Sequence, residues 1–367
     1  MNIKLWEGVS MLVGTIIGAG ILGLPYVTVK AGIFPGVFWI LFMGIVFLIV
    51  NLCLAEVVSR TNGHHQLVGL CKKYLGHWGK WFMGISFVVG VYGALVAYTV
   101  GSGDALSQIF SVSSLVASFV FYAVLVFVVL GGLKIFEEFE SVFVPLLLVI
   151  IVGIAWFGWE YASIDKVPLV SWNALFLPYG AVVFAYIGTS AIPEVGRVVS
   201  PKMLKKAIIY GSVIPIIAYS VFAVIVASIT GSSTTELATI GVGEVLGRTG
   251  VILLNAFAVL SMSTSFVGLS FALRHMFKEA GFSSLMSAIV TFVVPPLIIL
   301  MVNSGFVRTI EVSGAISGGL AGILVMLMFF SAKKHGDKHP YFNLHVHPLV
   351  GFLICLLFVI GVLSVLV

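Results

Sequence analysis

Long apolar stretches without any charged side chain alternate with short polar connections along the whole chain. Eleven such stretches contain no Asp, Glu, Lys or Arg, and each has about the 20 residues that a helix needs to cross a bilayer. They cover residues 8–29, 31–55, 81–103, 105–133, 141–159, 167–193, 207–235, 249–273, 280–307, 312–332 and 339–367. The pattern predicts an all-α integral membrane protein with about eleven transmembrane helices.

Helix-breaking residues interrupt two of these stretches. The first reads GTIIGAGILGLPY over residues 14–26, and the sixth reads FAYIGTSAIPE over residues 184–194. Lipid offers no water to backbone groups that glycine or proline frees, so such breaks persist where they line a cavity enclosed by protein. Two broken helices at matching places in two halves of a chain indicate the binding site of a secondary transporter.

The spacing of the two broken helices predicts an inverted repeat. If the first ten helices form two halves of five, the broken helices open each half, and the odd number gives the halves opposite orientations. We therefore expect a single transporter domain over residues 1–367, with five-helix repeats at 1–160 and 167–332 and an extra helix at 339–367.

Composition and charge support this interpretation and orient the chain. Hydrophobic residues make up 60% and charged residues 9%, and the mean hydropathy is +1.19, unlike any soluble domain. With the N-terminus inside, 15 of the 19 basic residues fall in inner connections, whereas the 14 acidic residues divide into 8 inside and 6 outside. We expect a multi-pass protein of the cell membrane with a cytoplasmic N-terminus. The net charge of +5 then reflects orientation, not nucleic-acid binding, and no obligate protein partner is evident.

Two smaller patterns carry structural predictions. Residues Leu67–Leu75, in an inner connection, predict either a short interfacial helix or a solvated loop. Glycines recur every four residues at Gly314, Gly318 and Gly322, which is typical of close helix packing through small residues.

The first break offers backbone groups to a zwitterion. Unwinding at residues 18–23 frees N–H groups at the start of the outer half-helix, which favour an anion, and carbonyls at the end of the inner half-helix, which favour a cation. No charged side chain lies in residues 8–29, so a substrate with its own paired charges fits, and an amino acid is the simplest. The alternative is a kinked structural helix.

At the second break, Phe184 and Tyr186 are candidates for the walls of a side-chain pocket, or ordinary core aromatics.

The eighth stretch carries a cluster of hydroxyl groups, in the run SMSTSF over residues 261–266. Hydroxyl oxygens suit small hard cations, so the cluster is a candidate for a sodium site. The alternative is that these side chains bond back to carbonyls of the preceding turn or join helices.

The acidic residues give little sign of chemistry inside the membrane. Glu56, Asp104 and Glu311 fall near predicted helix ends, whereas proton relays usually use intramembrane carboxylates or histidines. Paired carboxylates, a nucleophile–base pair and a metal cluster are all missing from the apolar stretches, so we do not expect an enzyme.

The run GAGILGLP at residues 18–25 resembles the first helix of the amino acid/auxin permease group and its bacterial relatives, the hydroxy/aromatic amino acid permeases, in the amino acid–polyamine–organocation superfamily. Weaker supporting matches are LAE at 54–56, FAY and IPE within 184–194, and TSFVG at 264–268. The resemblance implies a 5+5 inverted-repeat fold with discontinuous first and sixth helices and with substrate at mid-membrane.

The resemblance also implies site residues. Those for the substrate are Gly18, Ala19, Gly20, Ile21, Tyr92, Phe184, Tyr186, Ile187, Gly188 and Thr189. Those for a sodium ion, where the superfamily has one, are Gly14, Ile17, Thr264 and Ser265. Some proton-coupled relatives carry a lysine on the fifth helix, which 141–159 lacks, yet the bacterial aromatic permeases are generally thought to be proton-coupled, so the ion stays open.

We expect a secondary active transporter that imports neutral amino acids, aromatic or branched, by alternating access coupled to Na+ or H+. Its partners are then the amino acid and the bilayer, and it needs no cofactor beyond a coupling ion. The alternative function is that of a permease-like amino acid sensor, which would bind the same ligand without moving it.

Overall fold

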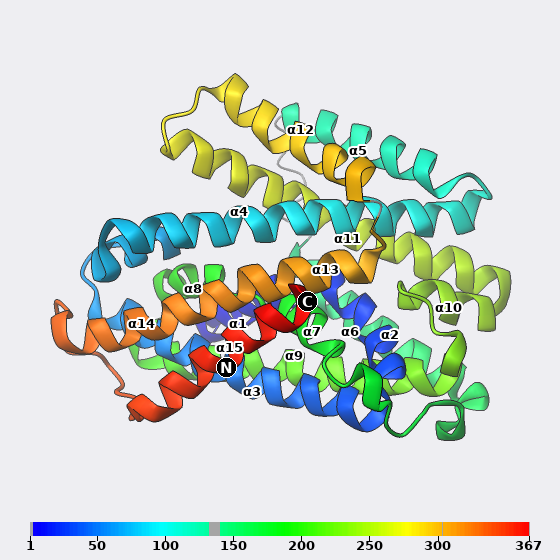
Figure 1. Cartoon of the computed structure of the whole chain (residues 1–367), viewed down its shortest axis with the longest axis horizontal. Coiled ribbons are helices and arrows are strands. Elements are labelled where there is room, and N and C mark those ends of the chain that lie inside the picture. The colour runs from blue at the N-terminus through cyan, green and yellow to red at the C-terminus, as the bar shows by residue number, and fades with distance from the viewer. Residues whose placement is uncertain (1–2, 132–139, 303, 367) are drawn as a thin grey trace.

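The computed structural model describes residues 3–131, 140–302 and 304–366, and within these ranges every regular element is a helix. Most helices run along the long axis of one bundle, with α5 and α12 on one side of α4, and α3, α14 and α15 on the other (Figure 1). The long helices are α3 (Ile33–Arg60), α4 (Leu67–Phe110), α5 (Ser114–Leu130), α6 (Glu140–Gly158), α9 (Pro201–Thr230), α11 (Gly247–Glu279), α12 (Ser284–Val302) and α15 (Pro348–Leu366).

Three further segments are built from consecutive shorter pieces. The pieces are α1 (Ile3–Ile16), η1 (Ala19–Gly23) and α2 (Leu24–Ala31); α7 (Pro178–Tyr186), η6 (Thr189–Ala191) and α8 (Ile192–Val198); and α13 (Phe306–Ser313), η8 (Gly314–Gly318) and α14 (Gly319–His335). The connections hold α10 (Ala238–Val245) and the short helices η3 (Trp159–Tyr161), η4 (Ile164–Lys166), η5 (Trp172–Ala174) and η7 (Gly231–Ser233).

The helices have the length and composition of membrane spans. Seven of those in the described ranges are long and apolar enough to cross a bilayer, or eight when the pair Ile3–Ile16 and Ala19–Ala31, bent by 46°, counts as one. Large apolar side chains such as Phe38, Leu115 and Phe352 are exposed on the outer surface, as lipid contact requires. The all-helical membrane fold is therefore confirmed, whereas the number of eleven helices and the bounds of the two repeats stay predictions.

A glycine divides α4 into a short first part and a long second part. Gly76 has φ 72° and ψ −157°, a conformation that only glycine adopts readily. Before it, Leu67, Leu70, Cys71 and Tyr74 are buried while intervening lysines are exposed. Of the two alternatives for residues 67–75, a short helix and a solvated loop, the structure has the helix, and it leads directly into the long part of α4.

Close packing at the predicted glycine series is confirmed. A Cβ on Gly314 would lie 2.3 Å from the carbonyl oxygen of Gly180 in α7, and one on Gly322 would lie 2.3 Å from Cε2 of Phe358 in α15. Small residues therefore let this span approach α7 on one side and α15 on the other.

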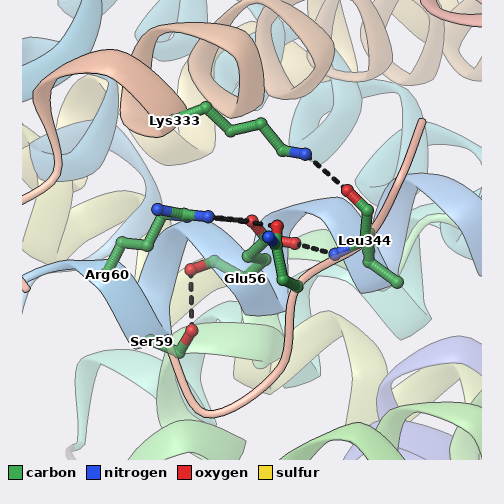
Figure 2. Close-up of polar contacts among 6 residues, drawn as sticks. Glu56, Ser59, Arg60, Lys333 and Leu344 are labelled. Carbon is green, nitrogen blue, oxygen red and sulfur yellow. Dashed lines mark hydrogen bonds and ion pairs between the residues drawn. The ribbon is translucent and has the colours of Figure 1, made fainter. Parts of the chain in front are cut away.

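A polar network joins helices at one end of the bundle (Figure 2). The carboxylate of Glu56, at the end of α3, is fully buried, accepts a 2.6 Å hydrogen bond from the N–H of Leu344, and pairs with Arg60 at 2.8 Å. Lys333 of α14 donates to the carbonyl of Leu344. The network holds the connection 336–347, which we call the strap, across the ends of α3 and α14. We call this end of the bundle, where α3 ends and α4 begins, the inner end.

Candidate functional site

The first helix is broken at the place the glycines predict. α1 ends at Ile16, and Gly18 is extended (φ −111°, ψ −158°) before the chain turns into η1. The N–H of Gly18 bonds to the carbonyl of Ile16 at 2.9 Å, so the α-helical hydrogen-bond ladder stops here. The break frees main-chain groups on both sides.

The second break follows α7 and has a similar form. Ile187 is extended (φ −65°, ψ 105°), and η6 begins after Gly188. A Cβ on Gly188 would lie 2.4 Å from the side chain of Ile16, and one on Gly20 would lie 3.0 Å from Cα of Ala185. The two breaks therefore lie against each other, as expected for the centre of a transporter.

One phenol on α9 joins the two broken helices. The hydroxyl of Tyr219 lies 2.6 Å from the carbonyl oxygen of Ile16 and 2.9 Å from that of Ala185, and the residue is fully buried. A phenol has one hydrogen to donate, so at any moment one of these carbonyls lacks the bond from Tyr219. The carbonyl of Ile16 also accepts from the N–H of Gly18 at 2.9 Å.

A cavity of about 140 Å³ lies beside both breaks. Its lining residues are Thr15, Ile16, Gly18, Gly20, Leu67, Met83, Ser86, Phe87, Gly90, Val91, Ala94, Tyr98, Phe184, Ala185, Ile187, Thr189, Ser190, Leu269, Ser317 and Ala321. None of these lining side chains is charged. Leu67 is the first residue of α4, so the cavity extends from the breaks toward the inner end of the bundle.

The opposite end of the site is closed by α13. Phe306 is fully buried, and its ring would lie 3.3 Å from a Cβ on Gly23 and 2.9 Å from one on Gly101 of α4. Ile310, one turn further, would lie 2.8 Å from a Cβ on Gly23. The arrangement is closed at this end, which we call the outer end, and hollow toward the inner end.

Half of the predicted substrate residues line the cavity. These are Gly18, Gly20, Phe184, Ile187 and Thr189. The side chains of Ala19 and Ile21 are buried in the core, and Gly188 packs against α1.

The structure directs the two predicted phenols away from the cavity. The hydroxyl of Tyr186 donates to the carbonyl of Ile40 in α3 at 3.0 Å, and that of Tyr92 donates to the carbonyl of Val290 in α12 at 2.8 Å. The face of α4 that does line the cavity carries Tyr98 instead. A helix turns 100° per residue, so Tyr92 and Tyr98 point in different directions.

Tyr98 is the polar group that sequence analysis missed. Its hydroxyl is hydrogen-bonded to Ser265 of α11, and both oxygens lie 3.8 Å from the place where a Cβ on Gly18 would be. The signal was present as helical spacing: Val91, Ala94 and Tyr98 recur at i, i+3 and i+7.

The hydroxyl groups predicted for a sodium ion are only partly placed at the first break. Ser265 lies beside Gly18, while the hydroxyl of Thr264 donates to the carbonyl of Ser261 at 2.9 Å. Each oxygen keeps lone pairs that can ligate a cation, so these donors fit Na+. The alternative was that these hydroxyls bond to the preceding turn or join helices. The bond from Thr264 to Ser261 is of the first kind, and the bond between Ser265 and Tyr98 is of the second.

Comparison with known proteins identifies the family. All of residues 1–367 match the sequence model of the tryptophan/tyrosine permease family. The chain belongs to this family. The permease is 24% identical to Glutamine transporter 2 of Aliivibrio fischeri (strain ATCC 700601 / ES114) over 369 residues, 96% of this chain and 95% of that protein. It is 23% identical to Tyrosine-specific transport system 1 of Haemophilus influenzae, covering 91% and 90%, and 24% identical to the Tryptophan-specific transport protein of Shigella flexneri, covering 90% and 87%.

Two solved structures share the fold of the permease. MhsT in complex with L-phenylalanine aligns with a TM-score of 0.69 at 16% identity, covering 100% of this chain and 98% of that one. The inward-facing conformation of Mhp1 aligns with a TM-score of 0.62 at 14% identity, covering 98% and 90%. The prediction of an aromatic amino acid permease is confirmed at the level of the family, which is one of transporters and not of enzymes. The wider superfamily stays an inference from the first-helix motif.

Proposed function

We propose that this permease imports neutral amino acids, those with aromatic or branched side chains included, across the cell membrane, by alternating access coupled to a cation. The observation that carries the proposal is a cavity that begins at two broken helices and has no charged lining side chain. The charges of a free amino acid must then be met by the main chain. Relatives named for tyrosine, tryptophan and glutamine support a neutral substrate, and their names support transport over sensing.

In this proposal the two breaks bind the ends of the amino acid. The N–H groups at the start of η1, near Gly18 and Gly20, receive the carboxylate, and the Tyr98 hydroxyl stands beside them. The carbonyls of Ile16 and Ala185 share a single hydroxyl hydrogen, so one of them is available to the ammonium group. The substrate side chain then lies among the apolar walls of α4 and α7.

The closed outer end and the hollow inner end support an inward-facing state. Transport requires that substrate and ion bind differently to this state and to an outward-facing one. The coupling ion is H+ or Na+, the latter at Gly14, Ile17, Thr264 and Ser265, and a gradient experiment separates the two.

The test is uptake into liposomes that hold the purified permease, with labelled L-tyrosine, L-tryptophan and L-glutamine. An inward proton gradient and an inward sodium gradient are imposed separately. Accumulation under either gradient supports import and names the ion. Binding without accumulation under both would favour the sensor, and absence of binding would exclude the substrate class.

The site is tested by Gly18→Ala. The nearest atoms to the new methyl group are the hydroxyls of Tyr98 and Ser265 at 3.8 Å, so the fold accommodates it while it narrows the space for the substrate. We expect substrate affinity to fall about tenfold, or about 1.4 kcal/mol. Gly268→Ala, on an exposed face of α11 with no atom within 4 Å, is the control and should bind normally. Unchanged affinity in Gly18→Ala would place the site elsewhere.

A further inference from the structure

Two carboxylates are buried among the described residues, and they differ in how they are satisfied. Glu56 has Arg60 and the N–H of Leu344 on its two oxygens. Glu311 in α13 is 4% exposed, yet its Oε1 has no hydrogen-bond partner, and Arg308 lies 3.5 Å from its Oε2. The sequence placed Glu311 at a helix end, but α13 to α14 form one apolar span, Phe306–His335, which contains it.

The charges around Glu311 only partly compensate a buried carboxylate. Its cation, Arg308, is 56% exposed and also donates to the carbonyl of Val365 in α15. Glu236 is close enough to repel it and has its own donor, the N–H of Val307. The phenol of Tyr26 on α2 also interacts with Glu311.

Among the residues that the structure describes, the other helices packed against α13 bring no further cation to Glu311. α7 meets it through main chain, because a Cβ on Gly180 would lie 2.4 Å from the carbonyl oxygen of Glu311. Three groups on α4 are engaged elsewhere: Tyr92 with Val290, Tyr98 with Ser265, and Asp104 with Ser114. On α7 the ring of Tyr179 packs against Gly361, and its hydroxyl is buried without a hydrogen-bond partner. An ionised carboxylate is costly in such a place, and a protonated one costs much less.

The position of Glu311 connects it to the proposed transport cycle. Its neighbours Ile310 and Phe306 close the outer end of the site against Gly23. Three residues beyond Glu311, at Gly314, the helix continues as the π-helical turn η8, a distortion often found at functional sites. Ser317, which lines the cavity, follows Glu311 by six residues, about 9 Å along the helix axis.

We propose that Glu311 is the binding site of the coupling proton. The carboxylate takes up H+ from outer water when α13 is displaced, and the neutral acid then allows α13 to close over the occupied site. When the proton leaves, the restored charge favours return of α13 toward water. The proposal rests on the proposed function, because it names the ion and the group that couple to import.

The test compares Glu311→Gln with the wild type in proteoliposomes. The probe is whichever of labelled L-tyrosine, L-tryptophan and L-glutamine the wild type accumulates best. Gln keeps the shape of the protonated acid but carries no exchangeable charge. We expect accumulation under an inward proton gradient to fall at least about tenfold, while exchange of internal for external substrate stays within about twofold. In weakly buffered medium, substrate should alkalinise the outside with the wild type and not with Glu311→Gln.

Control variants separate coupling from folding. Glu244→Gln removes an exposed carboxylate of α10 and should behave as the wild type, and Glu311→Asp should retain proton-driven accumulation. Arg308→Gln removes the cation, so Glu311 should hold its proton more firmly and the pH midpoint of uptake should move upward. This shift is measurable even if Glu311→Gln does not fold.

Three results would overturn the assignment. Proton-driven accumulation by Glu311→Gln at the wild-type level would do so, and so would an unmoved pH midpoint in Arg308→Gln. A wild type driven by sodium alone would refute Glu311 as the coupling site while leaving import intact. A wild type that accumulates nothing under either gradient would instead refute the proposed function.

Discussion

The hydroxyl oxygen of Tyr219 contacts both broken helices, at the carbonyls of Ile16 and Ala185. Removing its hydroxyl in Tyr219→Phe leaves the carbonyls of Ile16 and Ala185 without their shared donor, at a cost of about 1–3 kcal/mol. We expect the two breaks to lose their fixed spacing, so that substrate affinity falls as well as the thermal midpoint in detergent. Tyr122→Phe is the control, because its hydroxyl donates to the carbonyl of Phe292 at 2.7 Å, between α5 and α12. The control should lose stability but not affinity, and equal affinities in both variants would contradict a positioning role for Tyr219.

At this scale, the sequence predicted residues that act through the main chain better than those that act through side chains. Gly18 and Gly20 line the cavity because the break is a local property of glycine in an apolar stretch. Whether a phenol faces the cavity depends on how its helix is rotated, which neighbouring helices decide. Tyr92 and Tyr186 therefore bond to α12 and α3, while Tyr98 lies at the site.

At the scale of elements, helix breaks were predictable and helix limits were not. Both central breaks fall where glycine and proline interrupt apolar stretches. Dividing the sequence into charge-free stretches, however, places a helix end at every charged residue. In the structure α13 begins before Glu311, and Glu311 is buried within it. The helix α10 lies in a connection between two of the predicted spans. The π-helical turn η8 begins at Gly314, within the glycine series that predicted only close packing.

A main-chain hydrogen bond, from the N–H of Leu344 to Glu56, is expected to hold the strap in place. Leu344→Pro removes the N–H that Glu56 accepts at 2.6 Å, so a buried carboxylate loses a charge-assisted bond worth about 1.5–3 kcal/mol. We expect a lower thermal midpoint in detergent. Leu344→Ala keeps the N–H and removes only a half-buried side chain, so it should be clearly milder. Equal losses in the two variants would show that the side chain, and not the hydrogen bond, holds the strap.

For the molecule as a whole, the location of the cavity supports the proposed inward-facing state. Lining residues extend from the breaks to Leu67 at the inner end, while Phe306 and Ile310 fill the outer end. The basic residues concentrate at the connections expected to be cytoplasmic. If both inferences hold, the cavity faces the cytoplasm and its walls are reached from that side.

Cysteine labelling in oriented vesicles tests state and orientation together. Ser190 is exposed and lines the cavity, and Lys205 is exposed near the start of α9 but outside the cavity. A membrane-impermeant thiol reagent should label Ser190→Cys and Lys205→Cys from the cytoplasmic side, and saturating substrate should slow labelling only at position 190. The native Cys53 and Cys71 are buried, and the wild type supplies the background. Labelling of Lys205→Cys from outside would reverse the orientation. If a substrate is shown to bind but does not slow the labelling of Ser190→Cys, this cavity is not part of the transport path.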